Sequence, residues 1–199
     1  MTDTGQIRTI DFLIGRVVLA RETANKLGQI YDLIVDPFKG VLGGLAVRMP
    51  DQSLVLIDAQ EIYSFGVDAV MINSDRAALP VQDSPLKQLP LARTVLMGAK
   101  VLTEGGKLLG QIAHIYIHLA PEESLLFYEV RSSLLDKLLG HTLYFPASWG
   151  RALSQDGKRL VVSDDTSEKS DHTLHALETR LFGPPPEPDP VVTVRSRTH

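Results

Sequence analysis

The sequence predicts a mainly β fold, built from two tandem copies of a small β-barrel and followed by a short helix and a flexible, proline-rich tail. Three observations support this prediction: an internal repeat, runs of residues with period-two alternation, and turn residues that punctuate these runs without long amphipathic helices between them. The expected boundaries are residues 8–75 for the first barrel, 76–93 for a linker, 94–164 for the second barrel, and 165–199 for the helix and tail.

The internal repeat is carried by two glycine-containing motifs. Ile14–Val18 corresponds to Met97–Val101, and Lys26–Ile30 corresponds to Leu108–Ile112, so both motifs recur at nearly the same offset along the sequence. The later matches are Val47-Arg48 with Val130-Arg131, and Val70-Met71-Ile72 with Leu160-Val161-Val162. Such a repeat has roughly 60 to 70 residues, which is the size of a small domain rather than of a solenoid unit.

Each copy contains an alternating run that predicts a half-buried strand. In the first copy, Tyr31, Leu33 and Val35 alternate with Asp32, Ile34 and Asp36. In the second copy, Ala113, Ile115, Ile117 and Leu119 alternate with His114, Tyr116 and His118. Glycine pairs and the turn Pro37–Gly40 separate such strands from their neighbours, as expected for a small barrel or sandwich.

The copies are joined and followed by segments of different composition. Residues 73–94 carry three prolines, which predicts a partly extended linker. In residues 171–182, leucines recur at helical spacing before Gly183, which predicts one short amphipathic helix. The run from Pro184 to Pro190 is too rich in proline to pack, so a disordered or polyproline tail is expected.

The glycine motifs resemble the PRC-barrel family. The resemblance rests on Leu13–Val18 with Lys26–Asp36, Leu56–Ile62 and Ala69–Ile72 in the first copy, and on Leu109–Ile112, Phe145–Trp149 and Leu160–Val162 in the second. The family is named for a soluble domain of the photosynthetic reaction centre, and it includes the carboxy-terminal domain of the ribosome-maturation factor RimM. Tandem copies of this type would cover about three quarters of the chain.

This resemblance implies a six-stranded barrel in each half and a role in docking or assembly, with no family catalytic centre to carry over. Two departures prevent the transfer of a specific function. The reaction-centre protein has a transmembrane helix that this sequence lacks, and the ribosome factor has one barrel behind a different amino-terminal domain.

Composition narrows the function classes. A formal net charge of −4, from 20 Lys and Arg against 24 Asp and Glu, gives no general attraction for nucleic-acid phosphates. The absence of cysteine excludes disulfides, thiolate metal sites and a cysteine nucleophile. The polar start does not resemble a secretory signal, and no run of about 18 apolar residues occurs, so a cytoplasmic location is expected, with peripheral binding to a membrane complex left open.

No catalytic, cofactor or metal site is expected. His114 and His118 lie four apart on a predicted strand, which places their Cα atoms about 13 Å apart, so solvent-facing, structural histidines are favoured over a shared metal. His172, His175 and Glu178 could share a helix face, but an ordinary polar helix surface is favoured. The carboxylates Asp32, Asp36, Asp58 and Glu61 are interpreted as surface charge, because the repeat does not preserve them.

The second copy carries an apolar insertion between Arg131 and Phe145. Its leucines either cap the open end of the barrel or form an exposed patch for a partner. Aromatic residues near the insertion could extend such a patch, although Tyr116 could also pack against the first barrel. The candidate partner-binding residues are therefore Tyr116, Leu134, Leu135, Leu138, Leu139 and Trp149.

The favoured hypothesis is a non-enzymatic, protein-binding or assembly subunit without cofactors, with a photosynthetic reaction-centre complex as one candidate assembly and self-association left open. The alternative is an RNA-processing or ribosome-assembly accessory factor. That alternative would use basic residues that are scattered along the chain, which favours solvated charge instead: Arg93, Lys100, Lys107, Arg131 and Lys137.

Overall fold

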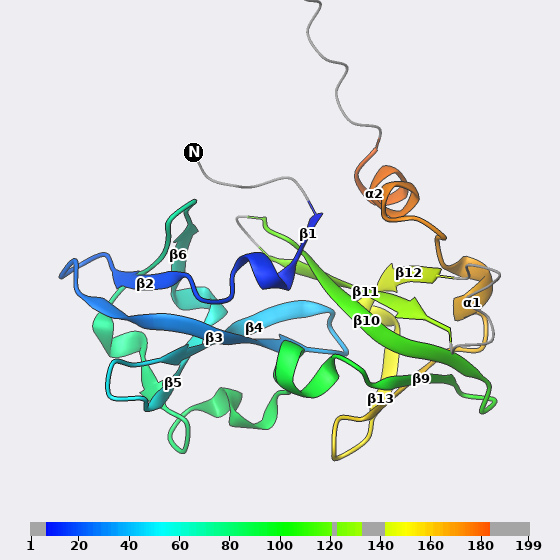
Figure 1. Ribbon diagram of the computed structural model, residues 1–199, viewed down its shortest axis with the longest axis horizontal. Helices are drawn as coiled ribbons and strands as arrows, with labels where there is room; N and C mark the ends of the chain where they lie inside the picture. The colour runs from blue at the N-terminus through cyan, green and yellow to red at the C-terminus, as the bar shows by residue number, and fades with distance from the viewer. Residues whose placement is uncertain (1–6, 121–122, 133–141, 184–199) are drawn as a thin grey trace, which may run out of the picture.

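The computed structural model describes residues 7–120, 123–132 and 142–183 (Figure 1). Within these residues, 14 strands form one large mixed sheet. The first eight strands are β1 (Ile7–Thr9), β2 (Val17–Ala20), β3 (Lys26–Asp36), β4 (Val41–Arg48), β5 (Leu54–Asp58), β6 (Ile62–Phe65), β7 (Ala69–Ile72) and β8 (Leu79–Pro80). The remaining strands are β9 (Lys100–Thr103), β10 (Leu108–His118), β11 (Leu125–Arg131), β12 (Thr142–Pro146), β13 (Gly150–Leu153) and β14 (Arg159–Val162). The mainly β prediction is confirmed.

Both halves of the chain repeat one strand-pairing scheme. In the first half, β2, β3, β4 and β5 pair antiparallel in succession, β7 returns parallel to β2, and β6 pairs with β7. In the second half, β9 to β14 make the same pairs in the same order. A short 3₁₀ turn joins the fourth and fifth strands of each scheme, η2 (Ala59–Glu61) and η7 (Ala147–Trp149). The sequence repeat therefore corresponds to a repeat of topology.

The two halves join through β4 and β11, at one residue pair, Val41 with Leu125. The Leu42 amide donates to Ser124 O over 2.9 Å, and the Leu126 amide donates to Gly40 O over 2.8 Å. These two bonds interchange under a twofold rotation about the Val41–Leu125 pair. The halves are thus related by an approximate twofold axis at the centre of the sheet.

The segment that leads into each half pairs with the long strand of the other half. β1 precedes η1 (Ile10–Phe12) and pairs antiparallel with β10 of the second half. Leu91 precedes η5 (Ala92–Leu96), a π-helical turn, and pairs with Ile34 on β3. The expected barrel boundaries do not include this exchange, because the leading segments carry no strand alternation of their own.

Residues 76–93, expected as a linker, fold against the first half. They contain η3 (Asp75–Ala77), β8 and η4 (Pro85–Gln88), and β8 pairs with β5. Leu86, Leu89 and Leu91 pack onto an apolar cluster on the outer face of β3, β4 and β5 that consists of Ile34, Ala46 and Leu56. The prolines do not prevent this packing, because Pro85 occupies the first turn of η4, where its missing N–H costs nothing.

The second half is followed by α1 (Thr166–Lys169) and α2 (Leu174–Phe182). α2 begins after Thr173, whose side chain accepts from the Ala176 amide, and ends at Gly183, which has a φ of 83°. The predicted short helix is confirmed. The predicted proline-rich tail, residues 184–199, lies outside the described residues.

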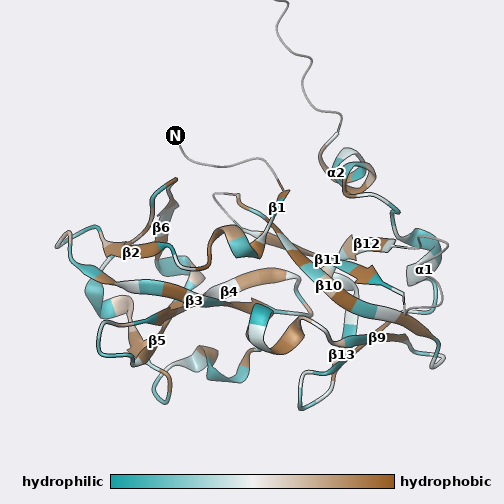
Figure 2. Ribbon diagram, viewed as in Figure 1, coloured by the Kyte–Doolittle hydropathy of each residue, from teal (hydrophilic) through white to brown (hydrophobic). Residues whose placement is uncertain are grey.

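One hydrophobic core runs through both halves, from Leu13 and Ile30 to Phe145 and Val162. The hydrophobic residues concentrate on the strands, whereas several turns and α1 are hydrophilic (Figure 2). Among the described residues, no helix has the length and apolar character needed to cross a membrane.

Candidate functional site

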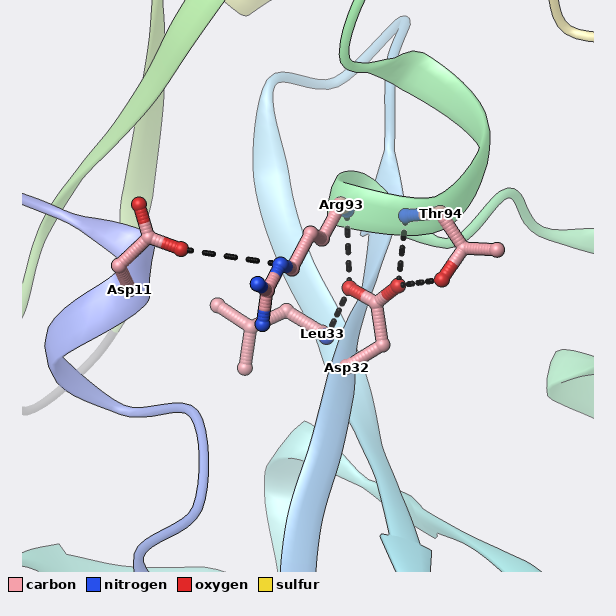
Figure 3. A network of polar contacts seen from close by, with 5 residues as sticks. All are labelled: Asp11, Asp32, Leu33, Arg93 and Thr94. Atoms are coloured by element: carbon pink, nitrogen blue, oxygen red, sulfur yellow. Dashed lines mark hydrogen bonds and ion pairs between the residues drawn. The ribbon is translucent and has the colours of Figure 1, made fainter.

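A buried carboxylate connects β3 of the first half to the segment that leads into the second half (Figure 3). Asp32 on β3 is fully buried and accepts from the Arg93 amide (2.9 Å), the Thr94 amide (2.8 Å) and the Thr94 hydroxyl (2.6 Å). Its Oδ1 also accepts from the Leu33 amide over 2.8 Å. The Arg93 side chain lies 3.9 Å from Asp11 on η1. Asp32 thus caps η5, while Arg93 reaches back to the element that leads into the first half.

The interpretation of Asp32 as surface charge is wrong. Both faces of β3 are covered, the inner face by the core and the outer face by η5 and the folded linker. The sequence does contain a signal for this. Ile34 lies two residues from Asp32, on the same strand face, and an apolar residue there indicates that this face is buried as well.

A cleft of about 580 Å³ opens where the two halves meet, and we call it the junction cleft. Its first-half lining comes from the β3–β4 turn, β4, η2, β6 and η4, and its second-half lining comes from the β10–β11 connection. The lining residues are Asp36, Lys39, Val41, Leu42, Gly43, Asp58, Ala59, Gln60, Ile62, Phe65, Leu86, Leu89, Ala120, Glu123 and Ser124. Its volume falls within the range of about 300–1,000 Å³ that is typical of ligand pockets.

The twofold axis relates the junction cleft to a second junction, which is closed. There the β3–β4 turn packs against η7 and β13 at two glycines. A Cβ on Gly40, whose φ is 74°, would collide with the backbone nitrogen of Ser148, and a Cβ on Gly150 would lie 2.7 Å from Pro37 O. The close packing at this junction therefore depends on the absence of two side chains.

At the open junction, the equivalent positions carry side chains. Ser124 is equivalent to Gly40 by the paired backbone bonds across the axis. Ile62 is equivalent to Gly150, because each is the first residue of its strand and pairs with the last residue of the neighbouring strand. Both Ser124 and Ile62 line the junction cleft. These side chains keep the two surfaces apart, which explains why only one junction is open.

The outer face of the second half carries a polar cluster in place of an apolar one. Glu129 on β11 is 2 % exposed and accepts from the Tyr116 hydroxyl (2.7 Å) and from Arg131 Nε (2.6 Å). Burial and the neighbouring Glu129 carboxylate raise the pKa values of Tyr116 and Tyr144 above the usual range of tyrosine. The equivalent positions in the first half are the apolar Ile34, Ala46 and Leu56, so the two copies differ in chemistry on this face.

Of the six predicted partner-binding residues, the structure describes two. Tyr116 is half-buried in a cluster with Ile7, Phe127 and Leu177, beneath β1 and α2. Trp149 stacks on Phe145, with ring centroids 5.9 Å apart, and its ring lies 5.8 Å from the Arg180 guanidinium. α2 therefore contacts both aromatic residues. The other four, Leu134, Leu135, Leu138 and Leu139, lie outside the described residues.

The two strand histidines have different surroundings. His114 lies edge-on to Tyr116, whereas His118 stacks on Phe182 of α2, with ring centroids 4.2 Å apart. Burial lowers the pKa of His118, and its Nδ1 is buried without a hydrogen-bond partner among the described residues. His118 is thus partly covered by α2 rather than solvent-facing as expected, because the face it shares with Tyr116 supports that helix. The part of the chain that the structure describes contains no group of three or more His, Asp or Glu placed to hold a metal ion.

Neither protein-family models nor curated proteins give a match to this chain.

Proposed function

We propose that this chain is a tandem PRC-barrel protein without catalytic activity, which acts by docking onto a protein partner or a larger protein complex. The duplicated pairing scheme supports the PRC-barrel part of the proposal. Each scheme contains six strands, the number that the resemblance implies, and brings its last pair back beside the first strand. The glycine motifs lie at equivalent places in the two schemes: Gly15 and Gly98 precede the first strand, and Gly28 and Gly110 lie on the second strand.

The observation that carries the docking part of the proposal is the junction cleft. It is lined from both halves, so neither copy alone would form it. The Asp32 contacts and the exchanged leading segments hold the halves in one arrangement, which keeps the cleft preformed. A preformed surface binds at a lower entropic cost than one that must be ordered by its partner.

Copurification tests the proposal directly. The full chain, tagged at its amino terminus, is recovered from native extract after ribosomes, membrane complexes and cytosol have been separated. We expect it to elute with a defined protein complex, from the cytosol or the cytoplasmic face of a membrane, and a photosynthetic complex would match one of the two family examples. Elution only as the isolated chain from all fractions would contradict the proposal.

Ribosome or RNA association is the competing outcome. We expect feeble, salt-sensitive binding to labelled RNA, because the chain carries a net negative charge of −4. A titration at near-physiological salt measures this. Submicromolar, sequence-selective binding would favour the RNA-processing alternative and overturn the protein-docking proposal.

The leucine insertion of the second half is a second docking surface under this proposal. Leu135→Glu together with Leu139→Glu places two charges on it. At an exposed interface the change should abolish complex association while the melting temperature stays the same, because exposed charges are well solvated. If the leucines cap the core instead, the melting temperature should fall sharply, because buried unpaired charge costs several kcal/mol. Unchanged association and unchanged melting would reject both roles.

A further inference from the structure

Four apolar side chains line the junction cleft, and we call them its apolar base. Ile62 and Phe65 of β6 line it together with Leu86 and Leu89, which extend from η4 and the residue after it. Leu86 is 8 % exposed, and the other three side chains are partly buried. A ligand that covers this base with apolar groups removes further apolar surface from water, which favours binding.

Three carboxylates also line the cleft, and we call them its acidic rim. Asp36, Asp58 and Glu123 line it, against the single ammonium group of Lys39. Lys39 lies 3.9 Å from Asp36, and its side chain is 77 % exposed. Within the described ranges, no cation lies within salt-bridge distance of Asp58 or Glu123. These two carboxylates are therefore available to a cation supplied by a ligand.

One carboxylate of the acidic rim, Asp58, has no charged equivalent at the closed junction. Asp58 caps η2 by accepting from the Gln60 amide over 2.9 Å. The equivalent residue before η7 is Pro146, which has no charge. The closed junction therefore lacks both features of the cleft: it has Gly150 in place of Ile62 and Pro146 in place of Asp58.

We propose that the junction cleft binds a segment of the protein partner that places a lysine or arginine beside a bulky apolar side chain. The apolar side chain packs on Ile62, Phe65, Leu86 and Leu89, and the cation pairs with Asp58 and Glu123. This inference rests on the proposed docking function, and it names the docking site and the chemistry of the segment that occupies it.

The same charges oppose other ligands. A phosphate or a nucleic acid would bring negative charge against the acidic rim. A divalent cation would need several oxygens arranged around one point, and the described carboxylates form no such group. A peptide cation needs only one or two carboxylates, together with the apolar base that the cleft provides.

Fluorescence anisotropy with two labelled decapeptides tests the inference on the full chain. One peptide alternates leucine with lysine, and the other alternates leucine with glutamate. We expect the lysine peptide to bind and the glutamate peptide to bind at least tenfold more weakly. Equal binding of the two peptides, or tighter binding of the glutamate peptide, would overturn the proposal.

Two variants assign the binding to the cleft. Asp58→Asn with Glu123→Gln removes the available charges but keeps an acceptor for the Gln60 amide. It should weaken binding of the lysine peptide at least tenfold. Glu22→Gln with Glu104→Gln is the matched control, because it removes two exposed carboxylates outside the cleft and changes the net charge equally. Equal weakening by both variants would show non-specific attraction and overturn the cleft assignment.

A third variant blocks the cleft. Ser124→Arg places a side chain with its own cation inside the cleft, and it should abolish binding of the lysine peptide while far-ultraviolet circular dichroism stays unchanged. In the copurification experiment, Asp58→Asn with Glu123→Gln should release the complex that the wild type recovers. A complex retained by both cleft variants would reject the cleft and leave the docking function standing. A wild type that recovers no complex would reject the docking function itself.

Discussion

At the scale of single residues, the buried Asp32 links β3 to η5 and so helps to hold the two halves in one arrangement. Asp32→Ala removes four accepted hydrogen bonds and leaves the Arg93 and Thr94 amides without their acceptor in a buried site. We expect it to lower the free energy of unfolding by about 3 kcal/mol, measured by urea denaturation. The exposed Asp68→Ala is the control and should change stability by less than about 0.5 kcal/mol. Equal stability of the two variants would contradict a bracing role for Asp32.

Gly40 allows a comparison that isolates the closed junction. Gly40→Ala places a methyl group against Ser148, whereas Gly106→Ala, at a φ of 83°, meets nothing within 4 Å. An alanine in the left-handed backbone conformation lowers the free energy of unfolding by about 1 kcal/mol in each variant. Only Gly40→Ala also strains the closed junction. We therefore expect it to lower the free energy of unfolding, measured by thermal denaturation, by about 2 kcal/mol more than Gly106→Ala does. A difference near zero would indicate that the turn and η7 separate without penalty.

At the scale of elements, the docking of α2 should depend on pH through His118. Burial lowers its pKa from the ordinary value of 6.5, so the unfolded chain binds more protons than the folded chain in mild acid. The free energy of unfolding should therefore fall as the pH is lowered from about 7 to about 5. His118→Gln should reduce this slope, and the exposed His175→Gln on α2 should leave it in place. A slope that persists in His118→Gln would contradict the assignment.

Some elements follow from the sequence and others do not. The α2 helix follows from leucine spacing and from Gly183, which are local signals. The strands of both copies follow from alternation and from the repeated glycines. The folding of residues 76–93 does not, because Leu86 and Leu89 find their partners on β4 and β5, far earlier in the sequence. Prolines indicate where regular structure is interrupted, but they do not indicate whether the chain still packs.

The candidate site follows from the sequence less well, for the same reason. Tyr116 and Trp149 are predicted as exposed aromatics, but the cover that α2 gives them depends on tertiary contacts. The junction cleft is formed by segments from both halves, and no local pattern marks them. The equivalence of Gly40 with Ser124 requires the register of β4 and β11. The register of β3 and β4 shifts between Gly44 and Leu42, and the repeat alone does not align residues across that shift.

At the scale of the whole molecule, the shared sheet and core predict cooperative unfolding. Differential scanning calorimetry should give one transition, with equal van't Hoff and calorimetric enthalpies. Ile30→Val in the first half and Ile112→Val in the second remove one methylene each from equivalent buried positions, and both should lower the same transition. Two separable transitions, each moved by only one variant, would contradict cooperative unfolding of the halves.

The exchange of leading segments also describes the symmetry of the molecule. The first half receives a single bridge from Leu91, the second half receives the strand β1, and the pair Val41–Leu125 lies on the rotation axis between the halves. This is the geometry of an isologous dimer whose two subunits share one polypeptide. Two identical subunits must carry the same residue at both symmetry-related positions. Linkage into a single chain removes that constraint, so glycines can close one junction while Ser124 and Ile62 open the other.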